Sequence, residues 1–312
     1  MIGNIAQFWR LTRELDIGAL REAFEQPVSL RVLGSDPLVA ERVARLIEPD
    51  PEAGEVSIGV LGYNTREQAD AYIAAIGGPL ESDARRHLSD LSVSEAPVLV
   101  VQAEAAAGML VLGIPDERIV TLGAFEADDE VRDRLFRSLV QAAPEVMLSA
   151  GRRHPLLREP VADHLIKDTS RVNAQFAALA SLPVNIPIFG GLVGDMADML
   201  VLTKNQVLLL FKLAGLYGRD ISLGGELLFE VAPVVGTAFL WRSTARMLVG
   251  LLPAMLGLVP KTLVAYTGTY IVGHTARYYY RFGHRPPPEI ARELREEARR
   301  VAAATLARLP GR

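Results

Sequence analysis

The chain of 312 residues contains no cysteine, which excludes disulfide bonds, thiolate metal sites and cysteine nucleophiles. Lysine is scarce, since only four of the 33 basic residues are lysines, and the net charge is -4. This charge balance gives no sign of a nucleic-acid partner, and we expect none. The N-terminus lacks the basic start, apolar run and small-residue cleavage site of a secretory signal. We therefore expect the chain to be in the cytoplasm or on the cytoplasmic face of a membrane.

The phosphate-binding motif of nucleotide-binding α/β proteins is missing. A P-loop has the pattern G-x-x-x-x-G-K-[ST], whose second glycine shapes the phosphate nest, whose lysine binds the phosphates and whose hydroxyl binds Mg²⁺. In the turn that begins at Gly34, these three positions hold Val39, Ala40 and Glu41. A carboxylate at the last position would repel a phosphate.

The same turn has a simpler interpretation. Ser35 or Asp36 is suited to cap the next helix, with Pro37 near its first position. No G-x-G-x-x-G motif follows any strand-like segment, so a dinucleotide cofactor is not indicated. The turn at 102–104 reads Gln-Ala-Glu and lacks the Asn-Lys-x-Asp pattern that reads guanine in GTPases.

Catalytic motifs are also missing. None of the five histidines forms H-E-x-x-H or another recognised ligand spacing, and no G-x-S-x-G motif occurs. His154 and His164 lie near several basic residues, and we interpret them as part of a solvated helix or hinge. We predict no catalytic, cofactor-binding or metal site, although an enzyme of an unrecognised type stays open.

Strand-like and helical patterns alternate between residues 27 and 150. Continuous apolar strands separated by helices indicate a parallel sheet that is covered on both faces. Strands are predicted at 29–34, 55–62, 96–102 and 118–123, and helices at 37–48, 65–78, 82–91, 103–113 and 128–143. Before them, residues 3–25 carry an apolar helical stripe, and a break is expected at 16–18.

The second half of the chain is poor in charge. Residues 173–283 are about 12% charged, against 22% for the whole chain, which marks a domain boundary and little solvated surface. The predicted organisation is an α/β domain with a small, Rossmann- or GTPase-like three-layer sheet, followed by an all-α apolar domain. Its parts are an N-terminal helical segment at 1–26, the α/β domain at 27–150, the apolar helical domain at 151–285 and an amphipathic helix at 286–312.

Three polar residues share one stripe of the apolar helix predicted within 182–218. Asp195 and Gln206 are separated by about 20° on a helix, and Asp198 lies about 60° from Asp195. Buried carboxylates must be paired, hydrogen-bonded or protonated. Three interpretations stay open: a structural polar seam, an exposed first turn of the helix, or a site for a proton, a cation or a ligand.

The run at 247–273 contains a single charge, Lys261, beside Pro260. Its length suits a helical hairpin with Lys261 at the tip and arginines at the base, either inserted shallowly in a membrane or buried in a soluble bundle. Tyrosines beside arginines suit a lipid headgroup interface. The side chains expected at that interface are Arg242, Arg246, Lys261, Arg277, Tyr278 and Arg281.

One stretch carries a family resemblance. The segment NAQFAALASLPVNIPIFGGLVGDMADMLVLTKNQVLLLFKLAGLYGRD, followed by AYTGTYIVG, resembles the bacterial domain of unknown function six-nine-seven over roughly residues 155–285. That family occurs behind Era-like GTPase domains and in some inner-membrane proteins. Its pattern falls here on Gly194, Asp195, Asp198, Gln206 and the Tyr-Gly pair at 217–218. The resemblance implies that residues 27–150 form a degenerate GTPase-like domain.

These features together predict a non-catalytic adaptor or scaffold at the cytoplasmic face of the inner membrane. It would have a nucleotide-incompetent GTPase-like domain and no cofactor. The expected partners are membrane lipid, a membrane protein or further copies of the chain. The alternative is a soluble, cytoplasmic carrier or sensor of a small molecule, with an apolar pocket among the C-terminal helices.

Overall fold

The computed structural model describes residues 15–49, 56–63, 68–107, 113–179, 194–224, 226–227, 230 and 258–307. Backbone contacts divide the chain into two compact units. One unit comprises residues 22–164 and contains the sheet. The other comprises residues 1–21 and 165–312 and is helical where it is described.

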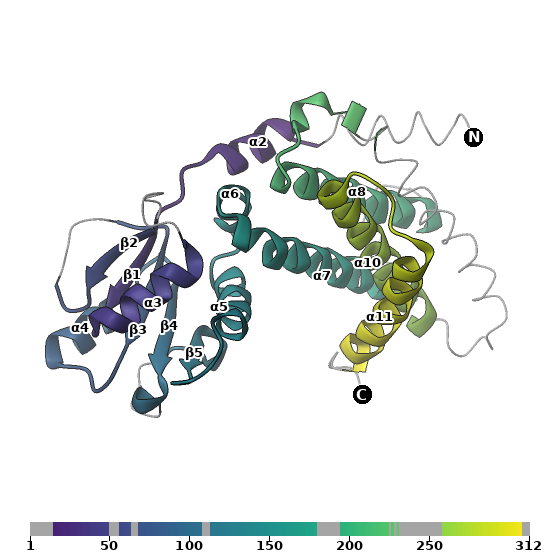
Figure 1. Cartoon of the computed structure of the whole chain (residues 1–312). Helices are drawn as coiled ribbons and strands as arrows, with labels where there is room; N and C mark the ends of the chain where they lie inside the picture. The colour runs from purple at the N-terminus through teal and green to yellow at the C-terminus, as the bar shows by residue number, and fades with distance from the viewer. Residues whose placement is uncertain are drawn as a thin grey trace. The chain divides into compact units, whose positions relative to one another are not determined.

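The α/β unit is built on a parallel sheet of five strands, ordered β2-β1-β3-β4-β5 (Figure 1). Each neighbouring pair of strands is parallel, as predicted for this part of the chain. β2 is an edge strand whose Ile58 and Val60 are 51% and 56% exposed. The strands are β1 (Leu30–Gly34), β2 (Val56–Val60), β3 (Ala71–Ile76), β4 (Val98–Ala103) and β5 (Ile119–Leu122).

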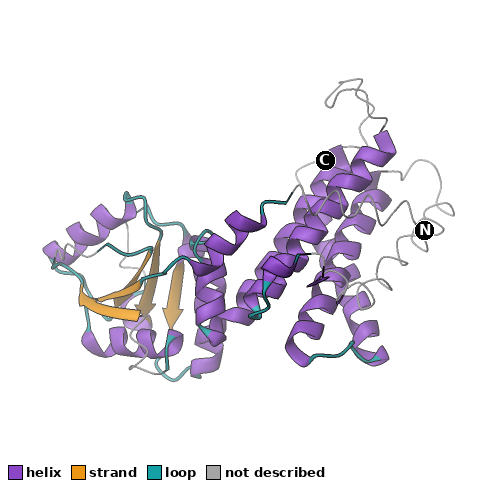
Figure 2. Cartoon of the chain, turned by 90° about the horizontal axis from the view of Figure 1, so that it is seen from above, coloured by secondary structure: helices purple, strands orange, loops and turns teal. Residues whose placement is uncertain are grey.

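Helices cover both faces of this sheet (Figure 2). α4 (Ser82–Ser92) packs on one face through Leu88, which joins a buried cluster with Leu33, Ala74 and Val100 of the strands. Side chains alternate between the two faces of a strand, so the residues on either side of Leu33, Ala74 and Val100 in their strands point to the opposite face of the sheet. α3 (Pro37–Ile47) and α5 (Asp128–Ala142) pack on the sheet and on each other.

One predicted helix is a strand. We expected a helix at 65–78, but residues 71–76 form β3, between β1 and β4 in the sheet. Its alanines favour a helix in isolation, yet the preference is weak and burial on both faces of a parallel sheet overrides it. The short helix expected at 103–113 is a 3₁₀ turn at Glu104–Ala106, and residues 108–112 lie outside the described part.

Short helices precede and follow the sheet. α2 (Ile17–Glu25) begins within the segment 16–18 where a break was expected, and Asp16 Oδ1 accepts a hydrogen bond of 2.8 Å from the Ala19 amide. Leu20 and Phe24 of its apolar stripe are buried, as predicted. α6 (Met147–Arg153) follows α5.

The described residues after α6 form four long helices: α7 (Pro155–Leu179), α8 (Gly194–Leu216), α10 (Leu258–Phe282) and α11 (Pro288–Ala307). α7 begins in the α/β unit and continues into the helical unit from residue 165. α10 packs against α8 and α11. The tail was predicted as an amphipathic helix, and α11 packs on α10 through the fully buried Ala298 and a hydrogen bond of 3.0 Å from Tyr270 to Glu297.

Gly273 of α10 marks the point where three helices come together. A Cβ atom built on Gly273 would lie 2.7 Å from Cγ1 of Ile166 in α7 and 3.2 Å from Cδ2 of Leu209 in α8. The first distance is shorter than real Cβ contacts, so the site accepts no side chain without a shift. Gly268 lies in the same helix, and no described atom comes within 4 Å of a Cβ built there.

We predict opposite effects for alanine at these two glycines. Gly273→Ala should lower the free energy of unfolding by about 1–2 kcal/mol, because overpacking against Ile166 outweighs the gain in helix propensity. Gly268→Ala should raise it by up to about 1 kcal/mol, because only the propensity term remains. Urea unfolding of the two variants provides the comparison, and equal shifts would contradict the close approach at Gly273.

Candidate functional site

The strand order identifies where a ligand would bind in an ordinary sheet of this kind. β1 and β3 are neighbours in the sheet, and the chain passes from β1 to β2 on one side and from β3 to β4 on the other, so the two connections run in opposite directions. Ligands of doubly wound sheets bind at this switch point, outside the carboxyl ends of the strands. The relevant turns are those that follow β1 and β3.

The first turn is capped by its own carboxylate. Asp36 is the N-cap of α3, and its Oδ1 accepts hydrogen bonds from the amides of Leu38 (2.8 Å) and Val39 (3.1 Å), with Pro37 at the first helical position. The capping role predicted for Ser35 or Asp36 is therefore confirmed for Asp36. Amides at a helix N-terminus are the groups that hold a bound phosphate. Here Asp36 supplies the negative charge itself.

The space between the two turns is filled. A Cβ atom built on Gly77 after β3 would lie 2.5 Å from Cβ of Asp36, and the Gly77 amide donates a hydrogen bond of 3.3 Å to Oγ of Ser35. On the other side, a Cβ on Gly34 would lie 2.6 Å from Cβ of Ala40. The Asp36 side chain thus packs directly against the turn where a ligand would enter.

The carboxyl ends of β4 and β5 are occupied by internal bonds. Gln102 is buried and donates a hydrogen bond of 3.2 Å to Oγ1 of Thr121. Arg134 of α5 donates to the Thr121 carbonyl (2.7 Å) and to both carboxylate oxygens of Glu126. The hydrogen bond from Arg134 lowers the pKa of the Glu126 carboxyl. The polar side chains at the carboxyl ends of β4 and β5 therefore bond to one another and to the backbone there.

One residue of the predicted polar stripe, Gln206, lies in a buried hydrogen-bond network with residues that were not predicted. Gln206 is buried, and its Nε2 donates a hydrogen bond of 3.0 Å to Oγ1 of Thr269. Asn173 of α7 donates to the same oxygen (2.8 Å), and Asn205 donates to Oδ1 of Asn173 (2.7 Å). The Thr269 hydroxyl in turn donates to the Ala265 carbonyl (2.9 Å). One hydroxyl therefore joins α7, α8 and α10.

The two aspartates of the seam are placed only by their backbone. Asp195 and Asp198 lie in the first turns of α8, and their side chains are outside the described part. Asn173 and Thr269 could have been noticed in the sequence, because each is an uncharged polar residue in a charge-poor segment.

The six interface candidates have different outcomes. Arg242 and Arg246 lie outside the described residues. Lys261 was expected at the tip of a hairpin, and its backbone lies in the first turn of α10, which tolerates Pro260 because amides there have no helical acceptor. The hairpin itself stays a prediction. The arm expected at 247–257 also lies outside the described part.

The remaining candidates lie near the end of α10. The Tyr278 ring packs on Phe282 with 4.5 Å between centroids, and the Arg281 guanidinium lies 5.0 Å from the Phe282 centroid. Phe282 is half exposed, and His284 packs on Tyr278. We call Tyr278, Arg281, Phe282 and His284 the aromatic–basic cluster. Arg277 lies one turn before Arg281 in the same helix.

His154 was interpreted as solvated, and that interpretation is wrong. The side chain is 1% exposed, and its Nδ1 lies 2.9 Å from Oε2 of Glu48, which is itself 17% exposed. The sequence places these residues 106 positions apart, so only the tertiary fold brings them together. Neighbouring arginines misled the interpretation, because a helix end can be basic on one side and buried on the other.

Two buried groups of α10 were not predicted. His274 is 4% exposed, packs on the Tyr270 ring at 4.1 Å, and has no hydrogen bond from either ring nitrogen to any described atom. Burial, with smaller contributions from Arg277 and Lys167, lowers the pKa of His274 to about 3. The Tyr280 hydroxyl is likewise buried without a described partner, and burial raises the pKa of this phenol.

Within the described ranges, no helix is long and apolar enough to cross a membrane. The same residues contain no group of three or more His, Asp or Glu side chains that could hold a metal ion.

Removal of the Asp36 carboxylate should destabilise the α/β unit. We expect Asp36→Ala to cost about 1 kcal/mol of unfolding free energy, because two amides of α3 lose their acceptor. Glu81 is the matched control: it occupies the N-cap of α4, a helix of the same 11 residues, without a side-chain cap bond. Glu81→Ala should change stability little, as measured by urea unfolding. Equal losses would argue against the cap.

The low pKa of His274 predicts a pH effect. Unfolded chains bind a proton at histidine below about pH 6.5, whereas folded His274 stays neutral down to about 3. Folded stability should therefore fall as pH drops through this window, by up to about 1.4 kcal/mol per pH unit from this group. His274→Phe should reduce that slope in urea unfolding, while His284→Phe at an exposed position should leave it unchanged. The same slope in all three proteins would refute the assignment.

No protein-family model matches the chain, and no curated protein or solved structure is significantly similar to it. The resemblance of residues 155–285 to the domain of unknown function six-nine-seven therefore stays a prediction.

Proposed function

We propose that the protein is a non-catalytic adaptor or scaffold whose GTPase-like α/β unit does not bind nucleotide. The observation that carries the proposal is the Asp36 carboxylate on the amides of α3, at the position where a phosphate would lie. A triphosphate would have to displace this carboxylate and also do without the lysine and hydroxyl of a P-loop. Without nucleotide binding, the α/β unit would act by binding partners through its surface.

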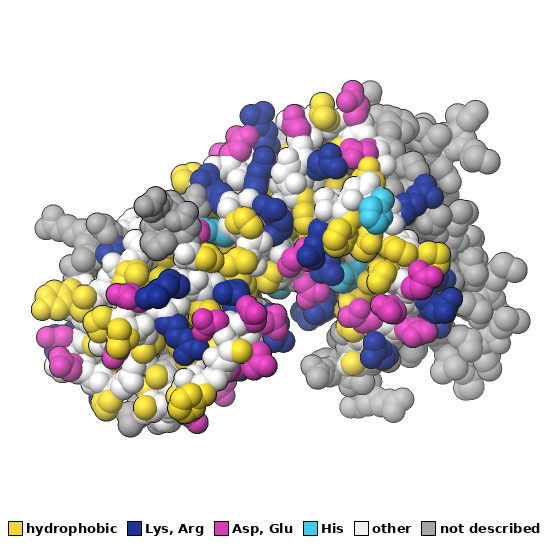
Figure 3. All heavy atoms as spheres, viewed as in Figure 1, with side chains coloured by type: hydrophobic (Ala, Val, Ile, Leu, Met, Phe, Trp, Pro, Cys, Tyr) yellow, Lys and Arg dark blue, Asp and Glu magenta, His cyan; other side chains and the backbone are white. Residues whose placement is uncertain are grey.

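The second part of the proposal is that the helical unit associates with lipid at the cytoplasmic face of the inner membrane. The aromatic–basic cluster supports it, because aromatic rings and arginines together suit the headgroup region. On the face drawn in Figure 3, hydrophobic and charged side chains are interspersed over the described residues of both units. The expected contact is therefore peripheral and local.

A soluble carrier or sensor is the second candidate. Buried polar atoms almost always have partners, and His274 and Tyr280 have none among the described atoms. A ligand that reached these groups would satisfy them. Fractionation without detergent separates the two functions: full-length protein in the membrane fraction supports the adaptor, and protein that stays entirely soluble supports the carrier.

The nucleotide part is tested with a fluorescent GTP analogue and Mg²⁺. We expect no saturable binding by the purified full-length protein at micromolar concentrations, with an active GTPase as the positive control. Micromolar, Mg²⁺-dependent binding or hydrolysis would overturn the proposal.

The lipid part is tested by sedimentation with vesicles. The protein should co-sediment with vesicles that contain phosphatidylglycerol, and Arg281→Gln should weaken binding about fivefold, since one basic residue near an anionic surface contributes about 1 kcal/mol. Arg137→Gln is the matched control, because Arg137 is an exposed arginine paired with Asp133 on α5. Failure of the wild-type protein to bind would refute membrane association.

A further inference from the structure

A cavity of about 350 Å³ lies at the edge of the sheet opposite to the closed switch point. It is formed around the amino ends of β4 and β5, between Val98 at the start of β4 and Arg118 just before β5. The end of α5 closes another side through Ala142. This volume is at the lower end of the range of small-molecule sites.

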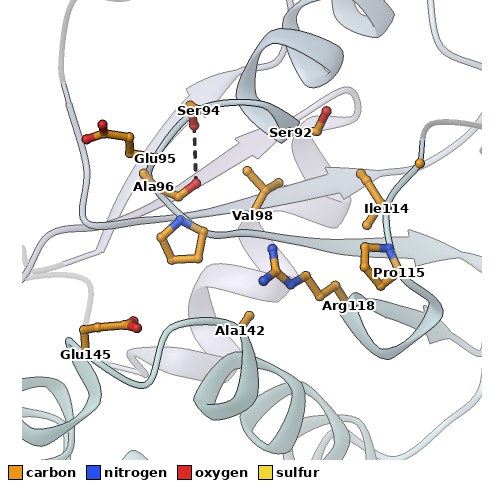
Figure 4. Close-up of a pocket in the computed structure, with 12 residues that line it drawn as sticks. Ser92, Ser94, Glu95, Ala96, Val98, Ile114, Pro115, Arg118, Ala142 and Glu145 are labelled. Atoms are coloured by element: carbon orange, nitrogen blue, oxygen red, sulfur yellow. Dashed lines mark hydrogen bonds between the residues drawn. The ribbon is translucent and has the colours of Figure 1, made fainter.

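Charges of both signs line the cavity without neutralising each other. Figure 4 shows that the Arg118 side chain extends between β4 and Ala142, while Glu145 reaches toward the cavity from another side. Among the described atoms, neither side chain has an ion pair or a side-chain hydrogen bond. The arginines of α5 differ, since each of them pairs with a carboxylate: Arg132 with Asp129, Arg134 with Glu126 and Arg137 with Asp133.

The rest of the wall combines apolar side chains with the hydroxyls of Ser92 and Ser94. Val98 is buried, and Ile114, Pro115 and Ala142 contribute hydrocarbon surface around the guanidinium. Glu95 adds a second carboxylate on the side of β4 that is remote from Arg118 in Figure 4. A guanidinium beside apolar surface is weakly hydrated, and its planar fork matches the two oxygens of a carboxylate.

We propose that this cavity binds a small zwitterion of the α-amino acid type. The ligand carboxylate pairs with Arg118, the ammonium group pairs with Glu145, and the side chain lies against Val98 and Ile114. A simple anion would leave the acidic side of the cavity facing a like charge, and a simple amine would do the same at Arg118. The site is separate from the switch point, so it does not depend on the proposed adaptor function.

The test begins with the full-length protein and the standard L-amino acids, each at millimolar concentration, in a thermal-shift assay. At least one amino acid should raise the unfolding temperature, and calorimetric titration should give saturable binding. Its deaminated acid and its decarboxylated amine are the matched probes, and each should bind about tenfold or more weakly because one charge pair is lost. Inorganic phosphate or the deaminated acid binding as tightly as the amino acid would overturn the proposal.

Three variants then locate the site. Arg118→Gln should weaken amino-acid binding about tenfold or more, since a hydrogen bond between charged groups is removed. Glu145→Gln should weaken the amino acid but leave the deaminated acid unchanged. Arg137→Gln, remote from the cavity on α5, should bind as the wild type does. No binding of any amino acid to the wild type, or unchanged affinity in both cavity variants with native circular dichroism, would refute the assignment.

Discussion

The α/β unit depends on the placement of one carboxylate, that of Asp36. Its two hydrogen bonds begin α3, and its Cβ packs against the turn at Gly77, so the same side chain fixes the helix and fills the crevice between β1 and β3. A helix N-terminus attracts negative charge through its free amides and its dipole. A protein that supplies the charge from its own chain gains local stability and loses a place for an external anion. In the proposed function, the side chain that begins α3 is therefore also the one that excludes a nucleotide.

A buried hydrogen-bond network joins the helices of the helical unit, whereas a buried apolar cluster joins α4 to the sheet of the α/β unit. The Thr269 hydroxyl accepts from Asn173 and Gln206, so a single oxygen fixes the relative positions of α7, α8 and α10. Buried networks of this kind are costly unless each member is satisfied, and they define one packing arrangement when they are. Gly273, one turn further along α10, lets the same three helices approach closely. The close helix packing at Gly273 and the hydrogen bonds at Thr269 thus lie one turn apart in α10.

Much of the architecture could be predicted from the sequence, because it follows from local patterns. Apolar runs gave β1, β2, β4 and β5, and the Asp-Pro pair at 36–37 gave the start of α3. β3 was missed because its alanines favour a helix, and only its position inside the sheet decides otherwise. The polarity of Gln206, Asn173 and Thr269 could be read from the sequence, but their pairing could not, since Gln206 is 63 residues from Thr269 and Asn173 is 96 residues from it. The pairing of His154 with Glu48 and the cavity around Arg118 depend on the tertiary fold in the same way.

The edge strand β2 has a consequence for the behaviour of the molecule in concentrated solution. Its sequence, VSIGV, contains neither a charged residue nor a proline, which are the usual devices that protect an open edge. Ile58 and Val60 leave hydrocarbon on its surface, and Gly59 weakens the strand's own conformational preference. Chains that are only partly folded therefore expose an apolar strand prone to aggregation until β1 pairs with its inner side.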